Sequence, residues 1–145
     1  PKVLKFLSLA NQLDKIIEIV TNRQFDDVGI LFRSNKDVQN AKMYFDQKGF
    51  TVEANIAFSP TVINFNNSKP KLLTYHSSKG LQFEAVFIPN CNVSDDGDRS
   101  PLYVAITRTY RDLFIMHSGD LSPFIKNIPP NLYETSLISN PGLRL

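Results

Sequence analysis

The sequence predicts one α/β domain built on a mainly parallel sheet with helices on both faces. The first observation is a set of short, continuous apolar runs, Val28–Phe32, Leu72–Tyr75 and Ala85–Ile88, which are typical of strands buried on both faces. The second is that segments with helical spacing alternate with these runs, as parallel strands require. The third is size, because 145 residues with 42% hydrophobic content suit a single core.

The N-terminal part alternates helix and strand. Apolar residues on one helical face predict a helix over Ser8–Asn22. After the first buried strand, Ser34 or Asn35 offers an N-cap and Gly49 a left-handed stop, so a second helix is expected between them. Phe50–Glu53 then predicts the next strand.

The C-terminal part continues the alternation after a long connection. Ala54–Pro70 is rich in Asn, Ser and Pro and predicts a loop, with room for a short strand around Val62 and Ile63. A helix is expected over Pro101–Thr109 and a last strand over Leu113–His117.

Composition narrows the class of protein. The net charge of +2 excludes neither nucleic-acid nor protein partners. The lone Cys91 predicts neither a disulfide nor a zinc site and favours a reducing, cytoplasmic location. No apolar run approaches the ~20 residues that span a membrane. A start at Pro1 without a signal segment predicts a piece of a longer polypeptide.

Three motifs carry the functional information. They are Phe32-Arg33-Ser34-Asn35, the stretch LLTYHSSKGLQFEAVFIP over Leu72–Pro89, and LYVAITR over Leu102–Arg108. In this order they resemble motifs IV, V and VI of superfamily 1 helicases of the UvrD/Rep type, and the resemblance covers roughly Leu9–Tyr133, almost the whole chain. It implies the C-terminal RecA-like domain, domain 2A, which has a P-loop NTPase-type fold. The phosphate-cradling pattern G-x-x-x-x-G-K-[ST] is absent from the sequence.

The resemblance also implies a domain organisation. Residues 1–133 would form the RecA-like domain, and residues 134–145 a loose tail. Larger family members insert a helical subdomain, 2B, between motifs IV and V. Only Ala54–Pro70 connects those motifs here, so we expect no large insertion.

The same resemblance implies an ATP site. Phe32 would stack on adenine, Arg33 would reach the terminal phosphate, and Gly80 and Gln82 would approach the nucleotide sugar, with Gln82 where a Glu is usual. Arg108 would be the arginine finger, so that Arg33 and Arg108 are the expected catalytic residues. We expect these five residues along one edge of the sheet. The structural alternatives are that Phe32 ends a core strand, that Arg33 is a solvated surface residue and that Arg108 caps a helix or forms a salt bridge there.

A second set of residues is implied to bind nucleic acid. Thr74, His76 and Ser78 would hydrogen-bond phosphates of single-stranded DNA, a contact that carries no sequence information. The alternative is that each has an ordinary structural role in its turn.

The predicted function is the C-terminal motor domain of an ATP-dependent DNA helicase or translocase. ATP and Mg²⁺ are the expected cofactors, and single-stranded DNA and an N-terminal RecA-like domain of the same polypeptide are the expected partners. That absent domain would hold the P-loop and the Mg²⁺ ligands, so the isolated chain should be inactive. One alternative is a helicase-derived interaction or regulatory module without motor activity. Another, an independent doubly wound nucleotide-binding enzyme, lacks the Gly-rich fingerprint.

Overall fold

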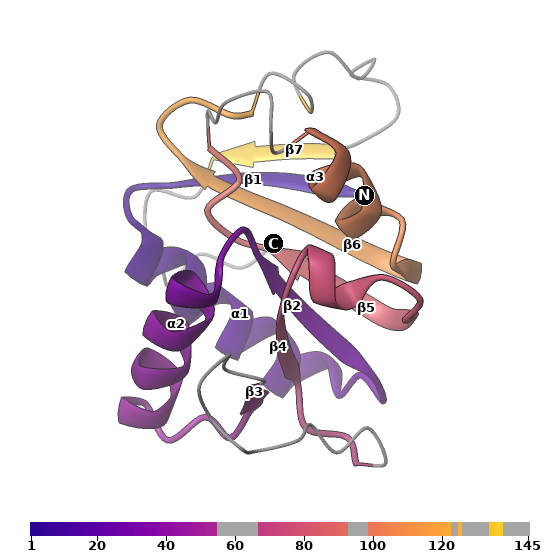
Figure 1. The fold of residues 1–145 in the computed structure, drawn as a ribbon. Coiled ribbons are helices and arrows are strands. Elements are labelled where there is room, and N and C mark those ends of the chain that lie inside the picture. Colours follow the sequence, from indigo (N-terminus) through magenta and orange to yellow (C-terminus); the bar gives the residue numbers. More distant parts are fainter. Residues whose placement is uncertain (55–66, 93–98, 123–124, 126–133, 138–145) are drawn as a thin grey trace.

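The computed structural model of the chain describes residues 1–54, 67–92, 99–122, 125 and 134–137, with the side chains of 99, 100 and 134–137 not described. The elements are β1 (Lys2–Phe6), α1 (Leu9–Arg23), β2 (Val28–Phe32), α2 (Asn35–Gln47), β3 (Glu53–Ala54), β4 (Lys71–Thr74), the 3-10 helix η1 (His76–Ser78), β5 (Phe83–Ile88), α3 (Arg99–Ile106), β6 (Thr109–Ser118) and β7 (Glu134–Leu137). They form one seven-stranded sheet in the order β3-β4-β2-β5-β6-β1-β7. Every neighbouring pair of strands in it is parallel, as predicted (Figure 1).

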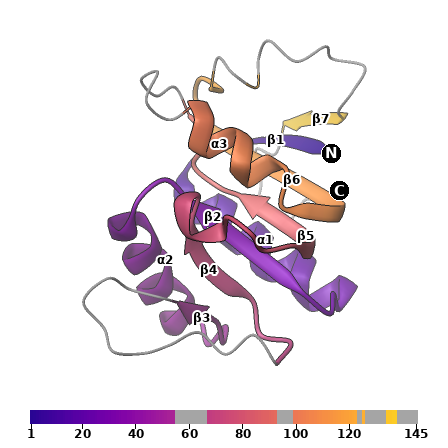
Figure 2. The same ribbon diagram turned by 45° about the vertical axis from the view of Figure 1, so that its right-hand side comes forward.

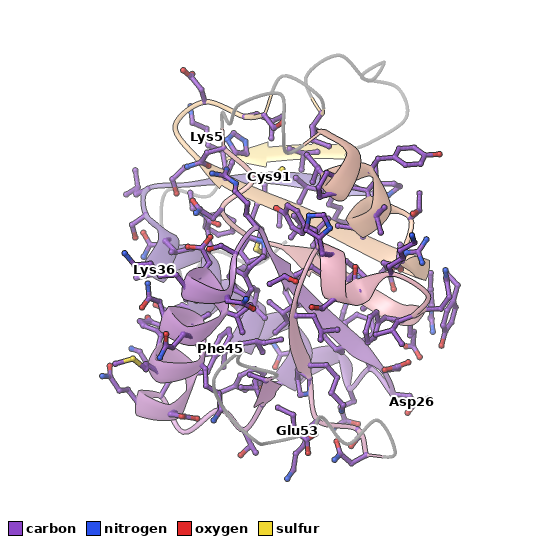
Figure 3. The ribbon with its side chains drawn as sticks, in the orientation of Figure 1. Lys5, Asp26, Lys36, Phe45, Glu53 and Cys91 are labelled. Atoms are coloured by element: carbon purple, nitrogen blue, oxygen red, sulfur yellow. The ribbon has the colours of Figure 1, made fainter. Side chains whose placement is uncertain are left out.

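Helices cover both faces of the sheet. Figure 2 shows α3 in front of β5 and β6, with α1 behind the sheet. The α1 and α2 helices share one apolar core with strand residues such as Ile30 and Phe87, and Phe45 of α2 points into this core (Figure 3). Leu102 and Ala105 of α3 share the other core with Leu31 and Val86. Neighbouring strand residues therefore face opposite cores, which is why these strands are apolar without a break.

Local signals set the ends of the first two helices. The Ser8 hydroxyl accepts a hydrogen bond from Asn11 N at 3.2 Å, and Ser34 Oγ accepts one from Asp37 N at 3.3 Å. The α1 helix ends at Gln24, which has φ 54°, and Gly49 follows α2 with φ 72°. The sequence predicted both helices, and for α2 it also predicted the N-cap at Ser34 and the stop at Gly49.

Several boundaries differ from the predictions. Strand β1 was not predicted, because Lys2 and Lys5 interrupt its apolar residues. Strand β6 is longer than predicted, and α3 ends before Thr109, which begins β6. The prediction of a loose tail is wrong for Glu134–Leu137, because β7 pairs with β1 there.

Two predictions lie outside the described residues, namely the short strand around Val62 and Ile63 and the tail over residues 138–145. Within the described ranges, no helix combines the length and apolarity needed to cross a membrane.

Candidate functional site

The predicted ATP-site residues are divided between the two ends of the sheet. Arg33 follows β2, so it lies at the carboxyl end of the parallel strands. Gln82 and Arg108 precede β5 and β6, whose first residues Phe83 and Thr109 are paired, so they lie at the amino end. The amino and carboxyl ends of the sheet are ~20 Å apart along β5, which has 6 residues. The prediction that all five residues gather along one edge is therefore wrong, because residues before and after parallel strands lie at opposite ends.

The side chain of Arg108 is held by oxygen atoms of neighbouring segments. Its Nε donates to Val104 O at 3.0 Å, one turn earlier on the chain, and its Nη2 donates to Thr107 Oγ1 at 3.1 Å. A longer contact of 3.5 Å joins Nη1 to Leu81 O. Within the described ranges no carboxylate pairs with Arg108. A half-buried guanidinium is thus oriented while its positive charge is not neutralised, which suits an anionic ligand.

The segment Gly80–Gln82 lies beside Arg108. Gln82 is exposed, and its Nε2 approaches Thr107 O at 3.4 Å. Gly80 has φ +85°, a conformation that disfavours other residues, and nothing lies within 4 Å of the position a Cβ would take. The backbone at Gly80 is therefore open to a ligand or partner, and the amide oxygen of Gln82 remains an acceptor for a hydroxyl.

Phe32 and Arg33 lie at the other end of the molecule. The side chain of Phe32 is only 2% exposed and packs in the core under α1 and α2. This placement supports the core alternative for Phe32, because adenine cannot stack on a ring that the protein already covers. Arg33 is exposed, and its charge acts on Cys91, although burial dominates and raises the pKa of that thiol to about 12. Figure 3 shows Cys91 at the carboxyl end of β5 and Asp26 before the amino end of β2.

The three predicted nucleic-acid contacts surround the 3-10 turn after β4. Thr74 Oγ1 lies 2.9 Å from Ser77 Oγ and accepts from Ser77 N at 3.1 Å, so its hydroxyl closes the turn. Ser78 is fully buried, and its hydroxyl donates to Tyr75 O at 2.6 Å. His76 alone of the three has an exposed side chain, and the neighbouring Ser77, which we did not predict, is also exposed. Thr74 and Ser78 thus shape the turn that presents His76 and Ser77.

A short hydrogen-bonded path joins this turn to Arg108. Leu81 N donates to Ser78 O at 3.0 Å, and Leu81 O is the oxygen that Arg108 approaches. The η1 turn also packs beside α3 (Figure 2). Leu81 was not singled out from the sequence, because it contributes through its backbone and backbone contacts leave no side-chain signal.

Two tyrosine side chains of α3 and β6 are exposed. Tyr103 of α3 is 58% exposed and Tyr110 of β6 is 64% exposed. Among the described residues, no group of three or more His, Cys, Asp or Glu could hold a metal ion.

Sequence comparisons agree with the motifs at Leu72–Pro89 and Leu102–Arg108. A sequence model of the family described as UvrD-like helicase C-terminal domain matches residues 71–116. A probable DNA helicase II homolog of Mycoplasma genitalium is 34% identical over 101 residues, which cover 59% of this chain and 14% of that protein. A probable DNA helicase of Mycoplasma pneumoniae is 33% identical over 110 residues, 63% of this chain and 17% of that protein. The chain thus spans less than a fifth of the length of these curated relatives.

Solved structures share the fold. The C-terminal domain of a possible DNA helicase from Lactobacillus plantarum superposes with a TM-score of 0.75 at 18% identity, covering 93% of this chain and 84% of that one. The C-terminal domain of the DEAD-box protein Dbp5 gives a TM-score of 0.64 at 12% identity, covering 94% and 89%. The family match, the curated relatives and the shared fold confirm that this chain resembles the C-terminal RecA-like domain of UvrD-like DNA helicases.

Proposed function

We propose that the chain is the C-terminal motor domain of an ATP-dependent DNA helicase or translocase. Its amino-end residues Gly80, Gln82 and Arg108 face an ATP and Mg²⁺ site on an N-terminal RecA-like domain of the same polypeptide. Its carboxyl-end residues, with His76 foremost, contact single-stranded DNA. Closing and opening of the cleft between the two domains moves the grip on the strand stepwise. The isolated chain turns over no ATP, and the full-length protein works in the cytoplasm, which fits the lone, buried Cys91.

The geometry of Arg108 carries the proposal. The guanidinium is oriented by Val104 O and the Thr107 hydroxyl and has no carboxylate partner among the described residues. An arginine oriented before the reaction stabilises charge that develops on a transferring phosphoryl group without first reorganising. A structural ion pair would instead occupy the guanidinium with a carboxylate. The bond from Nε to Val104 O is also the contact of a helix cap, because Val104 lies in the last turn of α3, but it leaves Nη1 and Nη2 outside that cap.

Arg33 is the residue whose proposed role the placement changes. At the carboxyl end it lies on the side of His76 and away from Arg108. We therefore propose that Arg33 acts mainly on the DNA strand and that its contribution to ATP hydrolysis is secondary. The rival function, an interaction module without motor activity, predicts that neither arginine affects hydrolysis.

Replacing Arg108 in the full-length protein tests the proposal. Arg108→Ala should lower kcat for ATP by on the order of 10² to 10⁴, or about 3 to 5 kcal/mol of transition-state stabilisation, with a much smaller change in ATP affinity. Arg108→Lys should recover little, because an ammonium lacks the planar fork of donors. Arg111→Ala is the matched control, since Arg111 is an exposed arginine at the same end of the sheet.

The melting temperature of each variant separates lost catalysis from lost folding. If folded Arg108→Ala hydrolyses ATP within a few-fold of the parent, Arg108 is not the finger and the interaction-module function moves to first place.

A further inference from the structure

We propose that Gly29 and Phe83 are positioning residues for Arg108: the ring of Phe83, seated against the bare backbone of Gly29, fixes the place at which β5 holds the Arg108 backbone. The effect of Gly29 and Phe83 on the position of Arg108 can be tested without measuring ATP hydrolysis, whereas their effect on hydrolysis rests on the proposed function.

The contact between Gly29 and Phe83 leaves no room for another atom. A Cβ added to Gly29 would lie 2.7 Å from Phe83 Cδ2 and 2.9 Å from Cε2, closer than real Cβ contacts. Phe83 is 1% exposed and belongs to the core under α3. Gly29 is the second of the five residues of β2, and a glycine inside a strand weakens it unless another group must come close. The ring of Phe83 is that group.

Phe83 in turn holds the segment that contains Arg108. Its backbone N–H donates to Arg108 O at 2.7 Å, and Phe83 pairs with Thr109 at the start of β6. The pairing is irregular after this point, because Ala85 pairs with Asp112 and β6 has an extra residue between the two pairs. The Thr109 hydroxyl closes this bulge: its Oγ1 lies 2.8 Å from Asp112 O and 3.1 Å from Glu84 O, and its one proton is shared between these two acceptors.

Because of the bulge, the position of Phe83 determines where the Arg108 backbone lies relative to β5. Regular pairing further along the sheet cannot set the register of Arg108, because the ladder is interrupted between Phe83 and Ala85. Two backbone hydrogen bonds hold Arg108: its N–H donates to Ala105 O of α3 at 3.1 Å, and its carbonyl accepts from Phe83 N at 2.7 Å. The bond to Phe83 is the one of these two that ties Arg108 to the start of β5. A displaced Phe83 ring must therefore shift the Arg108 backbone or break its bond to Phe83 N.

The Nε–H resonance of Arg108 reports this position directly. In full-length protein labelled with ¹⁵N at arginine, the signal is assigned by its loss in Arg108→Lys. Both Gly29→Ala, which displaces the ring, and Phe83→Leu, which removes it, should shift or broaden this signal. Phe87→Leu is the matched control, because Phe87 is an equally buried β5 residue that packs in the opposite core against Phe114. It should leave the Arg108 signal in place.

Rescue and kinetics complete the test. Gly29→Ala should lower the melting temperature less in a Phe83→Leu background than in the parent, because leucine lacks the ring that the new Cβ meets. In the full-length enzyme Gly29→Ala should lower kcat for ATP by about 10- to 100-fold at nearly constant KM, as expected for a misplaced catalytic group.

Each outcome of these experiments supports or overturns the positioning role of Gly29 and Phe83. An unchanged Arg108 signal in folded Gly29→Ala and Phe83→Leu proteins overturns the proposal, as does an equal shift in Phe87→Leu. If Gly29→Ala does not fold, the Phe83→Leu spectrum decides alone. If the signal shifts as predicted but Arg108→Ala hydrolyses ATP normally, the positioning role stands and the proposed function fails.

Discussion

The two ends of the sheet present their polar residues in different ways. At the amino end, Arg108 is oriented by two backbone carbonyls and a hydroxyl, beside a strand start that is locked by tight packing. At the carboxyl end, His76 and Ser77 are exposed on a single 3-10 turn that Thr74 and Ser78 close from within. A fixed cation is suited to binding a phosphoryl group whose charge develops at one point. An exposed turn is suited to binding the sugar-phosphate backbone of a DNA strand that moves along the protein.

This difference makes the two ends separable by mutation. Variants at the amino end should change the rate of hydrolysis, and variants at the carboxyl end should change strand affinity. The short path from Ser78 through Leu81 to Arg108 is the only connection among the described residues that we assign between them, so cross effects should be small.

The largest effect that would break this comparison concerns Arg33. Arg33→Ala in the full-length protein should weaken single-stranded DNA binding by roughly 10- to 100-fold at low salt, because a charged hydrogen bond is lost. The slope of log K against log salt should fall in magnitude by about 0.7, the value for one phosphate contact to a single strand. The measurement is a salt series of binding isotherms, with kcat for ATP measured alongside.

Arg111→Ala is the control for Arg33 too, because it removes an exposed arginine at the opposite end. Arg33→Ala could instead lower kcat as much as Arg108→Ala does and leave strand affinity intact. That result would place Arg33 in the ATP site and contradict the assignment of the two ends to different ligands.

A smaller effect is expected for His76. His76→Ala should weaken strand binding about 5-fold in a salt-sensitive way, since one hydrogen bond to a phosphate is worth on the order of 1 kcal/mol. Basal ATP hydrolysis should be spared, and His76→Gln, which keeps a donor, should retain more affinity. Strand affinity that stays constant in His76→Ala across the whole salt series would contradict the contact.

The fold was largely predictable because its signals are local. Apolar runs marked β2, β4 and β5, an apolar helical face marked α1, and a serine cap with a glycine stop marked α2. The short strands β1 and β7 were not predicted, because β1 mixes lysines with its apolar residues and both depend on pairing between distant parts of the chain.

The candidate site was predictable as a set of motifs but not as an arrangement. Residues before a parallel strand and residues after one lie at opposite ends, so Arg108 and Arg33 were separable from the predicted elements alone; the motif resemblance led us to group them. Phe32 shows a second limit, because the same aromatic residue can end a core strand or stack on a base. Gly29 left a usable signal, since an isolated glycine inside a strand indicates close approach of another group.

The central claim is that Arg108 binds charge that exists only while the phosphoryl group is transferred. It is tested most directly by the affinity of the full-length protein for ADP with aluminium fluoride, a transition-state analogue, and for a non-hydrolysable ATP analogue. We expect Arg108→Ala to weaken binding of the transition-state analogue by on the order of 10² to 10⁴, in step with kcat, and binding of the ATP analogue by only a few-fold. Equal losses for the two ligands, or no loss for either, would contradict the account.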